Sequence, residues 1–338
     1  MAQVKGLTPA LYDNVDKMVY DGIGQGLKEL KPIWREYFNV KTSDRSFERV
    51  VTMVGMGDAP EKPEGQAYTT DMIRQGYTKD FTHTSFGFGF EVTQDALEDD
   101  QYDQLQRAPK WLAFSCRVVE EKRAANVLNN GFTTETTPDG AALFSATHTL
   151  GGGGTARNIL GTNADLSETS LTQALIDIQT QTKLESGQLV APMQSFDLVV
   201  PPDLEFLAAR LVKSISRPQS ADNDINALKA LRTWNVIVNP YLTDNDAWFL
   251  LAANSKMHGI CSYTRVPITL LEPMTDSRTR NRIYAVRFRR SFGAWMWQNT
   301  FATPGAGGSE RRLNWDRTAA PPAPGCRPHC GRPIVMRR

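Results

Sequence analysis

One long segment, residues 93–130, constrains this chain more than any other, because its pattern predicts a helical rod of about 50 Å. Acidic residues cluster near its start, where the helix dipole favours negative charge, and Asn129, Asn130 and Gly131 form a C-terminal stop signal. Pro109 lacks a backbone donor and is expected to kink or split the helix. Periodicity alone fits an ordinary kinked core helix with an apolar stripe of Leu97, Leu105, Trp111, Leu112, Phe114, Val118, Val119 and Leu128.

The composition is that of a globular chain large enough for more than one domain: 338 residues, 41% hydrophobic and 22% charged. The formal net charge of +1 gives no overall signal for nucleic acid. The end of the chain differs, since residues 305–338 hold seven Arg against one Glu and one Asp and predict a disordered basic tail. There is no signal-peptide pattern and no apolar run of membrane-spanning length, so a cytosolic product is expected.

The residues before the long segment predict an arm and a β-hairpin. Residues 8–30 have the apolar spacing of an amphipathic helix, weakened by three glycines. Residues 47–92 predict one long two-stranded hairpin with an exposed turn at 57–68. Its last part alternates, with Phe86, Phe88 and Phe90 on one face and glycines on the other. An isolated hairpin is marginally stable in water, so this one should lie against a sheet or another chain.

The second half of the chain predicts mixed α/β structure. Ser167 is expected to cap a helix at 166–184, with Ser170 in place of the usual acidic partner, and Asp203 to cap a helix at 203–214. Strands are predicted at 196–202, 234–242, 247–253, 266–272 and 283–297, and a short helix at 224–234. The second and third of these strands are expected to be antiparallel neighbours because their link is short. The charged stretch 273–282 is predicted to be a hairpin tip.

A search for catalytic chemistry finds little. Ser145 and His148 invite a hydrolase hypothesis, but no GxSxG motif surrounds the serine. The tail offers three zinc-type ligands, Cys326, His329 and Cys330, without a fourth. The sequence therefore predicts no catalytic residue, no metal and no cofactor. Four carboxylates of the long helix are interpreted as surface charges: Asp99, Asp100, Glu120 and Glu121.

In their order along the chain, these features resemble the major capsid proteins of tailed bacteriophages, most closely the Mu-like major head subunit family. An arm, a β-hairpin and a long helix are followed by the phrases ALFSATH (142–148), WNVIVNP (234–240) and DAWFL (246–250). Paired strands around a charged turn then close the pattern. The resemblance spans about residues 8–303, and its strength lies in the order of the features.

The resemblance implies an α+β fold of the Hong Kong 97 type. It implies an N-terminal arm (1–46), an extended loop (47–92), a peripheral domain built on the long spine helix (93–187 and 266–304) and an axial domain (188–265), with 305–338 as a tail. The extended loop would lie over a neighbouring subunit through Lys62, Glu64, Phe86, Phe88 and Phe90. The peripheral hairpin tip would meet adjacent capsomers through Asp276, Arg278, Arg280 and Arg282.

The implied function is that of a phage or prophage major head subunit. Copies would assemble through pentamers and hexamers into an icosahedral shell around double-stranded DNA, in the host cytoplasm and then in the virion. The expected partners are further copies, a separate scaffolding protein, portal and decoration proteins and packaged DNA, with no membrane. Two alternatives stay open: a hydrolase using Ser145 and His148, and a nucleic-acid-binding protein acting through the basic tail.

Overall fold

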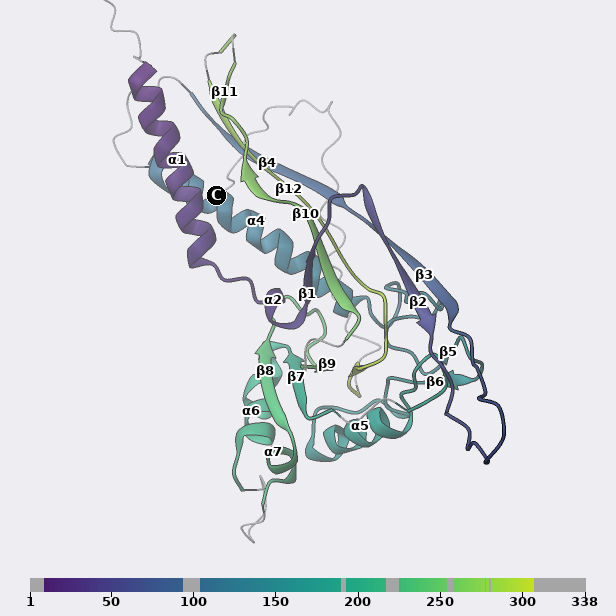
Figure 1. Ribbon diagram of the computed structural model, residues 1–338. Coiled ribbons are helices and arrows are strands. Elements are labelled where there is room, and N and C mark those ends of the chain that lie inside the picture. Colours follow the sequence, from purple (N-terminus) through teal and green to yellow (C-terminus); the bar gives the residue numbers. More distant parts are fainter. Residues whose placement is uncertain are drawn as a thin grey trace, which may run out of the picture.

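The computed structural model describes residues 9–93, 104–189, 193–216, 225–253, 258–276, 278–279 and 281–306. It shows an elongated α+β subunit in which two helices lie beside one large sheet and a second sheet with short helices lies below (Figure 1). The predicted tail falls outside the described residues beyond Ala306.

The two long helices pack along each other. Helix α1 spans Pro9–Glu29 and helix α4 spans Gln104–Asn129, which gives α4 a length of about 39 Å. Gly26 makes the close contact possible, because a Cβ there would lie 3.0 Å from the Ala113 Cβ. Pro109 lies inside α4, so it does not split the helix; the residues proposed as its first turns, 94–103, lie outside the described part of the chain.

The apolar stripe expected along α4 is only partly correct. Leu112 and Leu128 are buried, but Trp111 is 65% and Phe114 is 52% exposed. The helix turns a different set of residues inward, and that set includes two carboxylates described below. Both Cys116 and Cys261 are buried free thiols.

The large sheet has the strand order β1-β10-β12-β11, with β4 also paired to β12. Strand β1 runs parallel to β10, and β12 is antiparallel to both β10 and β4. The strands span Asn39–Thr42 (β1), Thr84–Val92 (β4), Ile260–Leu270 (β10), Met274–Thr275 (β11) and Arg282–Ala294 (β12). The long helix α4 packs on β12 and β4, so this sheet and the helix form the body of the upper half.

The prediction of one two-stranded hairpin over 47–92 is wrong in its last part. Strand β2 (Phe47–Val54) pairs with β3 (Arg74–Thr82) as a separate ribbon joined by the loop 55–73, whereas β4 leaves the ribbon and joins the large sheet. The reason is packing: the Phe86 and Phe90 rings stack on Phe288 and Tyr284 of β12.

The second sheet has the order β13-β9-β7-β8. Its strands are Ser195–Val200 (β7), Thr233–Val238 (β8), Trp248–Ala252 (β9) and Thr300–Thr303 (β13). Strands β8 and β9 were expected to be neighbours, and this is wrong: β7 lies between them, parallel to β8 and antiparallel to β9. Strand β7 is buried along almost its whole length. Its two edges pair with β8 and β9, and its two faces lie in two different core clusters, with Val199 in one and Leu198 and Val200 in the other.

Short helices surround this sheet: α2 (Trp34–Tyr37), α5 (Glu168–Thr180), the 3-10 turn η1 (Pro202–Leu204), α6 (Glu205–Lys213) and α7 (Ala227–Leu231). Ser167 and Ser170 form a complete capping box at α5, so serine replaces the usual carboxylate without loss of the motif. No Asp203 cap is present, because Asp203 lies within η1, whereas Asn226 caps α7 through its side chain. A small ribbon pairs β5 (His148–Thr149) with β6 (Thr155–Ala156).

One core cluster links the two sheets. It contains residues of α2, α4, β7, β9 and the segment after β12, and its largest members are Trp34, Tyr37, Phe38, Phe249 and Trp297. The proposed domain boundaries remain predictions. Strand β10 runs across the boundary proposed between residues 265 and 266. Strand β13, from the proposed peripheral domain, pairs with β9 of the proposed axial domain.

Candidate subunit-interface sites

The extended loop between β2 and β3 projects from the subunit and is exposed throughout residues 55–73. Lys62 lies over the Tyr68 ring at 4.2 Å, and Glu64 is exposed at the loop's end. Asp71 accepts hydrogen bonds from the backbone N–H groups of Gly57 and Met72, and these bonds lower the pKa of Asp71. The bond from Gly57 also connects the two sides of the loop. Several apolar side chains of the ribbon and loop face solvent: Met53, Met56, Tyr68, Met72 and Ile73.

A buried hydrogen-bond chain fixes the joint between this ribbon and the large sheet. The Ser43 hydroxyl donates to Glu48 Oε1 at 2.6 Å, and the His83 ring lies 3.0 Å from both Ser43 Oγ and Ser291 Oγ. The Glu48 carboxylate can only accept, so the Ser43 hydroxyl hydrogen points to Glu48. The proton between Ser43 and His83 therefore lies on His83 Nε2, and Nδ1 accepts from the Ser291 hydroxyl. Burial, then Arg289, lowers the pKa of His83, which keeps the ring neutral in this arrangement.

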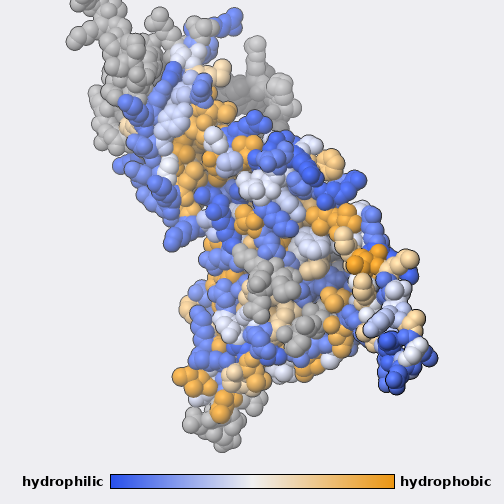
Figure 2. Space-filling view, in the orientation of Figure 1, coloured by the Kyte–Doolittle hydropathy of each residue, from blue (hydrophilic) through white to orange (hydrophobic). Residues whose placement is uncertain are grey.

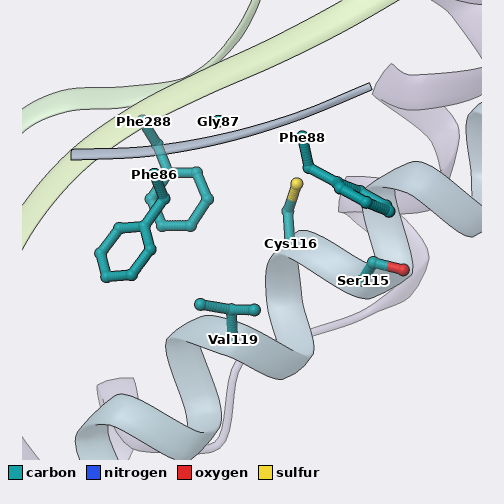
Figure 3. A pocket seen from close by; sticks show the side chains of 7 residues that line it. All are labelled: Phe86, Gly87, Phe88, Ser115, Cys116, Val119 and Phe288. Atoms are coloured by element: carbon teal, nitrogen blue, oxygen red, sulfur yellow. The ribbon is translucent and has the colours of Figure 1, made fainter. Parts of the chain in front are cut away.

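The three phenylalanines of β4 lie on one face of the strand, as predicted. Phe86 and Phe90 are partly covered by their ring stacks, while Phe88 is 59% exposed. Two of them, Phe86 and Phe88, border an apolar cavity between β4 and α4. The cavity has a volume of about 260 Å³ and is lined by Phe86, Gly87, Phe88, Ser115, Cys116, Val119 and Phe288 (Figure 3).

The charged tip after β10 holds only some of its predicted residues at the surface. Asp276 accepts hydrogen bonds from the Arg278 backbone and the Thr279 hydroxyl, which lower its pKa and shape the turn. Arg278 is exposed, and Arg280 lies outside the described residues. Arg282 is the first residue of β12 and forms an ion pair with Asp16 of α1, so within the subunit it ties the arm to the sheet.

The geometry around Ser145 and His148 does not support a hydrolase. The two nitrogens of the buried His148 ring contact Asp139 Oδ2 at 2.8 Å and Asn158 Oδ1 at 3.1 Å, and the ring stacks on Trp297. The Ser145 hydroxyl bonds instead to the Thr147 backbone. Burial alone would raise the pKa of Asp139, but hydrogen bonds from His148 and Thr137 outweigh it and lower the pKa. This is a buried structural hydrogen-bond network without an activated nucleophile.

The sequence interpretation of Glu120 and Glu121 as surface charges is wrong, since both are buried. Glu120 pairs with Arg117 at 2.8 Å and with Arg290 at 3.0 Å, and the Arg290 guanidinium lies over the Trp34 ring. Glu120 and Arg290 lie 170 positions apart in the chain, so no local pattern in the sequence indicates that they pair. They meet because β12 packs against α4 in the folded chain. The other two carboxylates, Asp99 and Asp100, lie outside the described residues.

Glu121 anchors the segment that follows the arm. Its carboxylate accepts from the backbone N–H of Ile33 at 2.6 Å and of Trp34 at 3.3 Å, and so caps the start of α2. Burial raises the pKa of Glu121 to about 7, against the lowering effect of these hydrogen bonds; Glu120 raises it further and Arg117 lowers it.

This raised pKa predicts a pH-dependent stability. The folded state binds the Glu121 proton more tightly than the unfolded chain does. The stability that this proton adds to the folded state is therefore fully present below about pH 4.5 and is lost as the pH rises to about 7. The neutral variant Glu121→Gln should therefore gain stability over the parent, on the order of 3 kcal/mol, between these two pH values. Urea unfolding of the parent and of the Glu121→Gln variant at pH 4.5 and 7.5 measures the difference in stability. An equal change of stability with pH in the two proteins would refute the prediction.

Other site types have no support in the described part of the chain. No group of three His, Cys, Asp or Glu side chains there could hold a metal ion, and Cys326, His329 and Cys330 lie beyond it. Nor does any helix in the described ranges have the length and apolar character needed to cross a membrane.

The family of the chain follows from a comparison with known protein families. The sequence model of the phage capsid protein family matches residues 76–299, which is more than half of the chain. The chain belongs to the phage capsid protein family. Its role is that of a major capsid protein, a structural protein and not an enzyme. A comparison with curated proteins found no match.

Solved structures show the same fold at low identity. The capsid of cyanophage P-SCSP1u is 9% identical with a TM-score of 0.53, over 81% of this chain and 88% of that chain. The mature capsid of bacteriophage PhiM1 is 12% identical with a TM-score of 0.52, over 81% and 87%. The virus-like particle from Pyrococcus furiosus is 10% identical with a TM-score of 0.50, over 85% and 98%. The α+β fold of the Hong Kong 97 type predicted for this capsid protein is confirmed.

Proposed function

We propose that this capsid protein is the Mu-like major head subunit of a tailed phage or prophage, and that it assembles through pentamers and hexamers into an icosahedral shell. One observation carries the proposal: large apolar side chains are exposed at two separate projections of the subunit. One group lies in the ribbon and extended loop, with Met72 79% and Tyr68 82% exposed. Exposed apolar groups at projecting ends are what neighbouring copies would cover.

The second group lies at the lower end of the subunit, and we call it the axial tip. It comprises Phe206 of α6, Leu231 of α7, and Ile215 and Ile225 between those helices, all at least 67% exposed. Figure 2 shows hydrophobic surface gathered at this end, below α6 and α7 in the view of Figure 1. In the proposed shell the axial tips of five or six copies meet around a symmetry axis.

The proposed interfaces extend to the other predicted regions. The extended loop, with Lys62 and Glu64, lies over an adjacent subunit, and the tip formed by Asp276 and Arg278 meets a neighbouring capsomer. Its mixed charges would set pairing and register more than affinity. Arg282 contributes by holding the arm in place through Asp16.

The same proposal covers the remaining partners and the location. The shell encloses double-stranded DNA, which a chain with a formal net charge of only +1 leaves free to slide. Scaffolding, portal and decoration proteins are separate chains, assembly takes place in the host cytoplasm, and the product is the virion.

The test is assembly. The full chain, alone and with its genomic neighbours, should form rings, sheets or closed shells by light scattering and negative-stain electron microscopy. The double variant Phe206→Asp with Leu231→Asp should remain folded but lose closed shells, because charges replace the apolar contact at the axis. A matched variant, Phe206→Leu with Leu231→Met, keeps the apolar surface and should assemble.

Two outcomes count against the proposal. Normal shells from the Asp variant would remove the axial tip from the interface. A monomeric parent protein at high concentration, even with its neighbours present, would overturn the proposed function.

A further inference from the structure

Strand β4 is an open edge of the large sheet. It pairs with β12 through nine consecutive positions, from Thr84 opposite Arg290 to Val92 opposite Arg282, without a register shift. Among the described residues no strand pairs with its other edge. Six of its nine residues are exposed, consistent with an edge that the described part of the chain leaves unpaired (Figure 1).

This edge lacks the features that keep edge strands from pairing. Natural edges are protected by lysine, proline, a bulge or a very short length. Strand β4 has nine residues, contains no lysine or proline, carries a single charge at Glu91 and is regular throughout. The ladders of β10 with β12 and of β2 with β3 both contain register shifts, whereas the ladder of β4 with β12 contains none.

The sequence of β4 is symmetric about its middle residue. Residues 86–90 read Phe-Gly-Phe-Gly-Phe, with Phe88 at the centre of both the repeat and the strand. A two-fold axis at Phe88 would place two copies antiparallel, with Phe86 opposite Phe90 and Gly87 opposite Gly89. Like residues then meet on each face, which is the property of a self-complementary, isologous contact.

The surroundings of the edge fit a second strand on both faces. On the aromatic face, Phe88 is the exposed member of the three, and it borders the 260 Å³ cavity toward Cys116 (Figure 3). On the other face the glycines leave a shallow hollow with Leu271, Ile283 and Ala285 among its lining residues. Strand addition uses main-chain hydrogen bonds along the edge and alternate side chains in such hollows.

We infer that the free edge of β4 binds the β4 edge of a second copy, antiparallel and in register about Phe88. The inference rests on the proposed function in requiring contact between copies, and it names the strand and register through which one such contact forms. A continuous sheet across the two-fold axis covers both Phe88 side chains and satisfies the open edge.

A cysteine placed at the axis tests the register. Directly opposed antiparallel residues have Cα atoms about 4.5–5.5 Å apart, within the range of about 4.4–6.8 Å that a disulfide spans. Phe88→Cys should therefore cross-link to its own counterpart. The parent for the test carries Cys116→Ala, because Cys116 lines the same cavity, together with Cys326→Ser and Cys330→Ser.

The controls come from the same strand. A cysteine at Phe86 would lie about 14 Å from its counterpart, at about 3.4 Å per residue, which is too far to bond. Phe86→Cys and Phe90→Cys should each stay monomeric alone and form a disulfide dimer when mixed. Products are compared on non-reducing gels under conditions of assembly, and thermal unfolding checks that each variant is folded.

The outcomes separate this inference from the proposed function. A dominant Phe88→Cys dimer with monomeric single controls supports the pairing. Equal amounts of disulfide dimer from all three single variants would overturn the pairing. The absence of a dimer from Phe88→Cys would also overturn it, and this is the result expected if another strand or protein occupies the edge. Closed shells by electron microscopy without the Phe88→Cys dimer reject the pairing alone, whereas a parent that never associates rejects the proposed function.

Discussion

The variant Glu120→Ala is expected to lose about 3–5 kcal/mol of unfolding free energy, because it leaves a buried cation without its counter-charge. Arg290 is 4% exposed and lies 3.0 Å from Glu120, which also pairs with Arg117. Burial already lowers the pKa of Arg290, a sign that its charge is costly there even with the carboxylate present. Chemical denaturation of the unassembled subunit measures the loss.

Two further variants separate charge from packing. Glu120→Gln keeps the shape and should be less damaging than alanine, and it remains measurable if the alanine variant fails to fold. The double variant Glu120→Leu with Arg290→Met removes both charges and should recover much of the loss. Glu61→Ala, in the exposed loop, is the control; an equal effect at Glu61 and Glu120 would contradict the importance of the buried pair.

The second large effect is expected at Gly259, immediately before β10. A Cβ at this position would lie 2.3 Å from both the backbone N and the backbone O of Met296. The two segments are held together by a hydrogen bond from Trp295 N to Gly259 O, so neither can move away without losing it. Gly259→Ala should therefore destabilise the subunit by about 3 kcal/mol and lower the yield of folded protein.

The same substitution elsewhere provides the matched control. Gly24 lies within α1, and a Cβ there would meet no atom within 4 Å. Gly24→Ala should stabilise the subunit by up to about 1 kcal/mol, because alanine has the higher helix propensity. Thermal unfolding of the two variants should thus shift in opposite directions, and a neutral Gly259→Ala would show that the close backbone approach is not required.

Local patterns in the sequence predicted the local structure well. Helix α1, the capping serines of α5, the buried strand β7 and the antiparallel pairing of β10 with β12 follow from apolar spacing, cap chemistry and turn signals. These features depend on residues close together in the chain, where side-chain period and backbone preference act directly. The order of such elements was also sufficient to point to the capsid family.

Long-range pairing was not predictable in the same way. Strand β7 separates β8 from β9, and β4 joins β12 almost two hundred residues later in the chain. A short link favours neighbouring strands but cannot exclude a third strand whose two apolar faces require the central position.

The sequence by itself therefore determined the elements, their order, the absence of a catalytic motif and the family. The tertiary structure decided which charges are buried, with Glu120 beside Arg290 and Glu121 at the start of α2, and which edge and apolar groups remain open at β4 and the axial tip. The physical reason is that burial and strand pairing depend on distant residues meeting in space. A polar residue on a helix gives no sign in its own sequence of whether water or a strand will cover it.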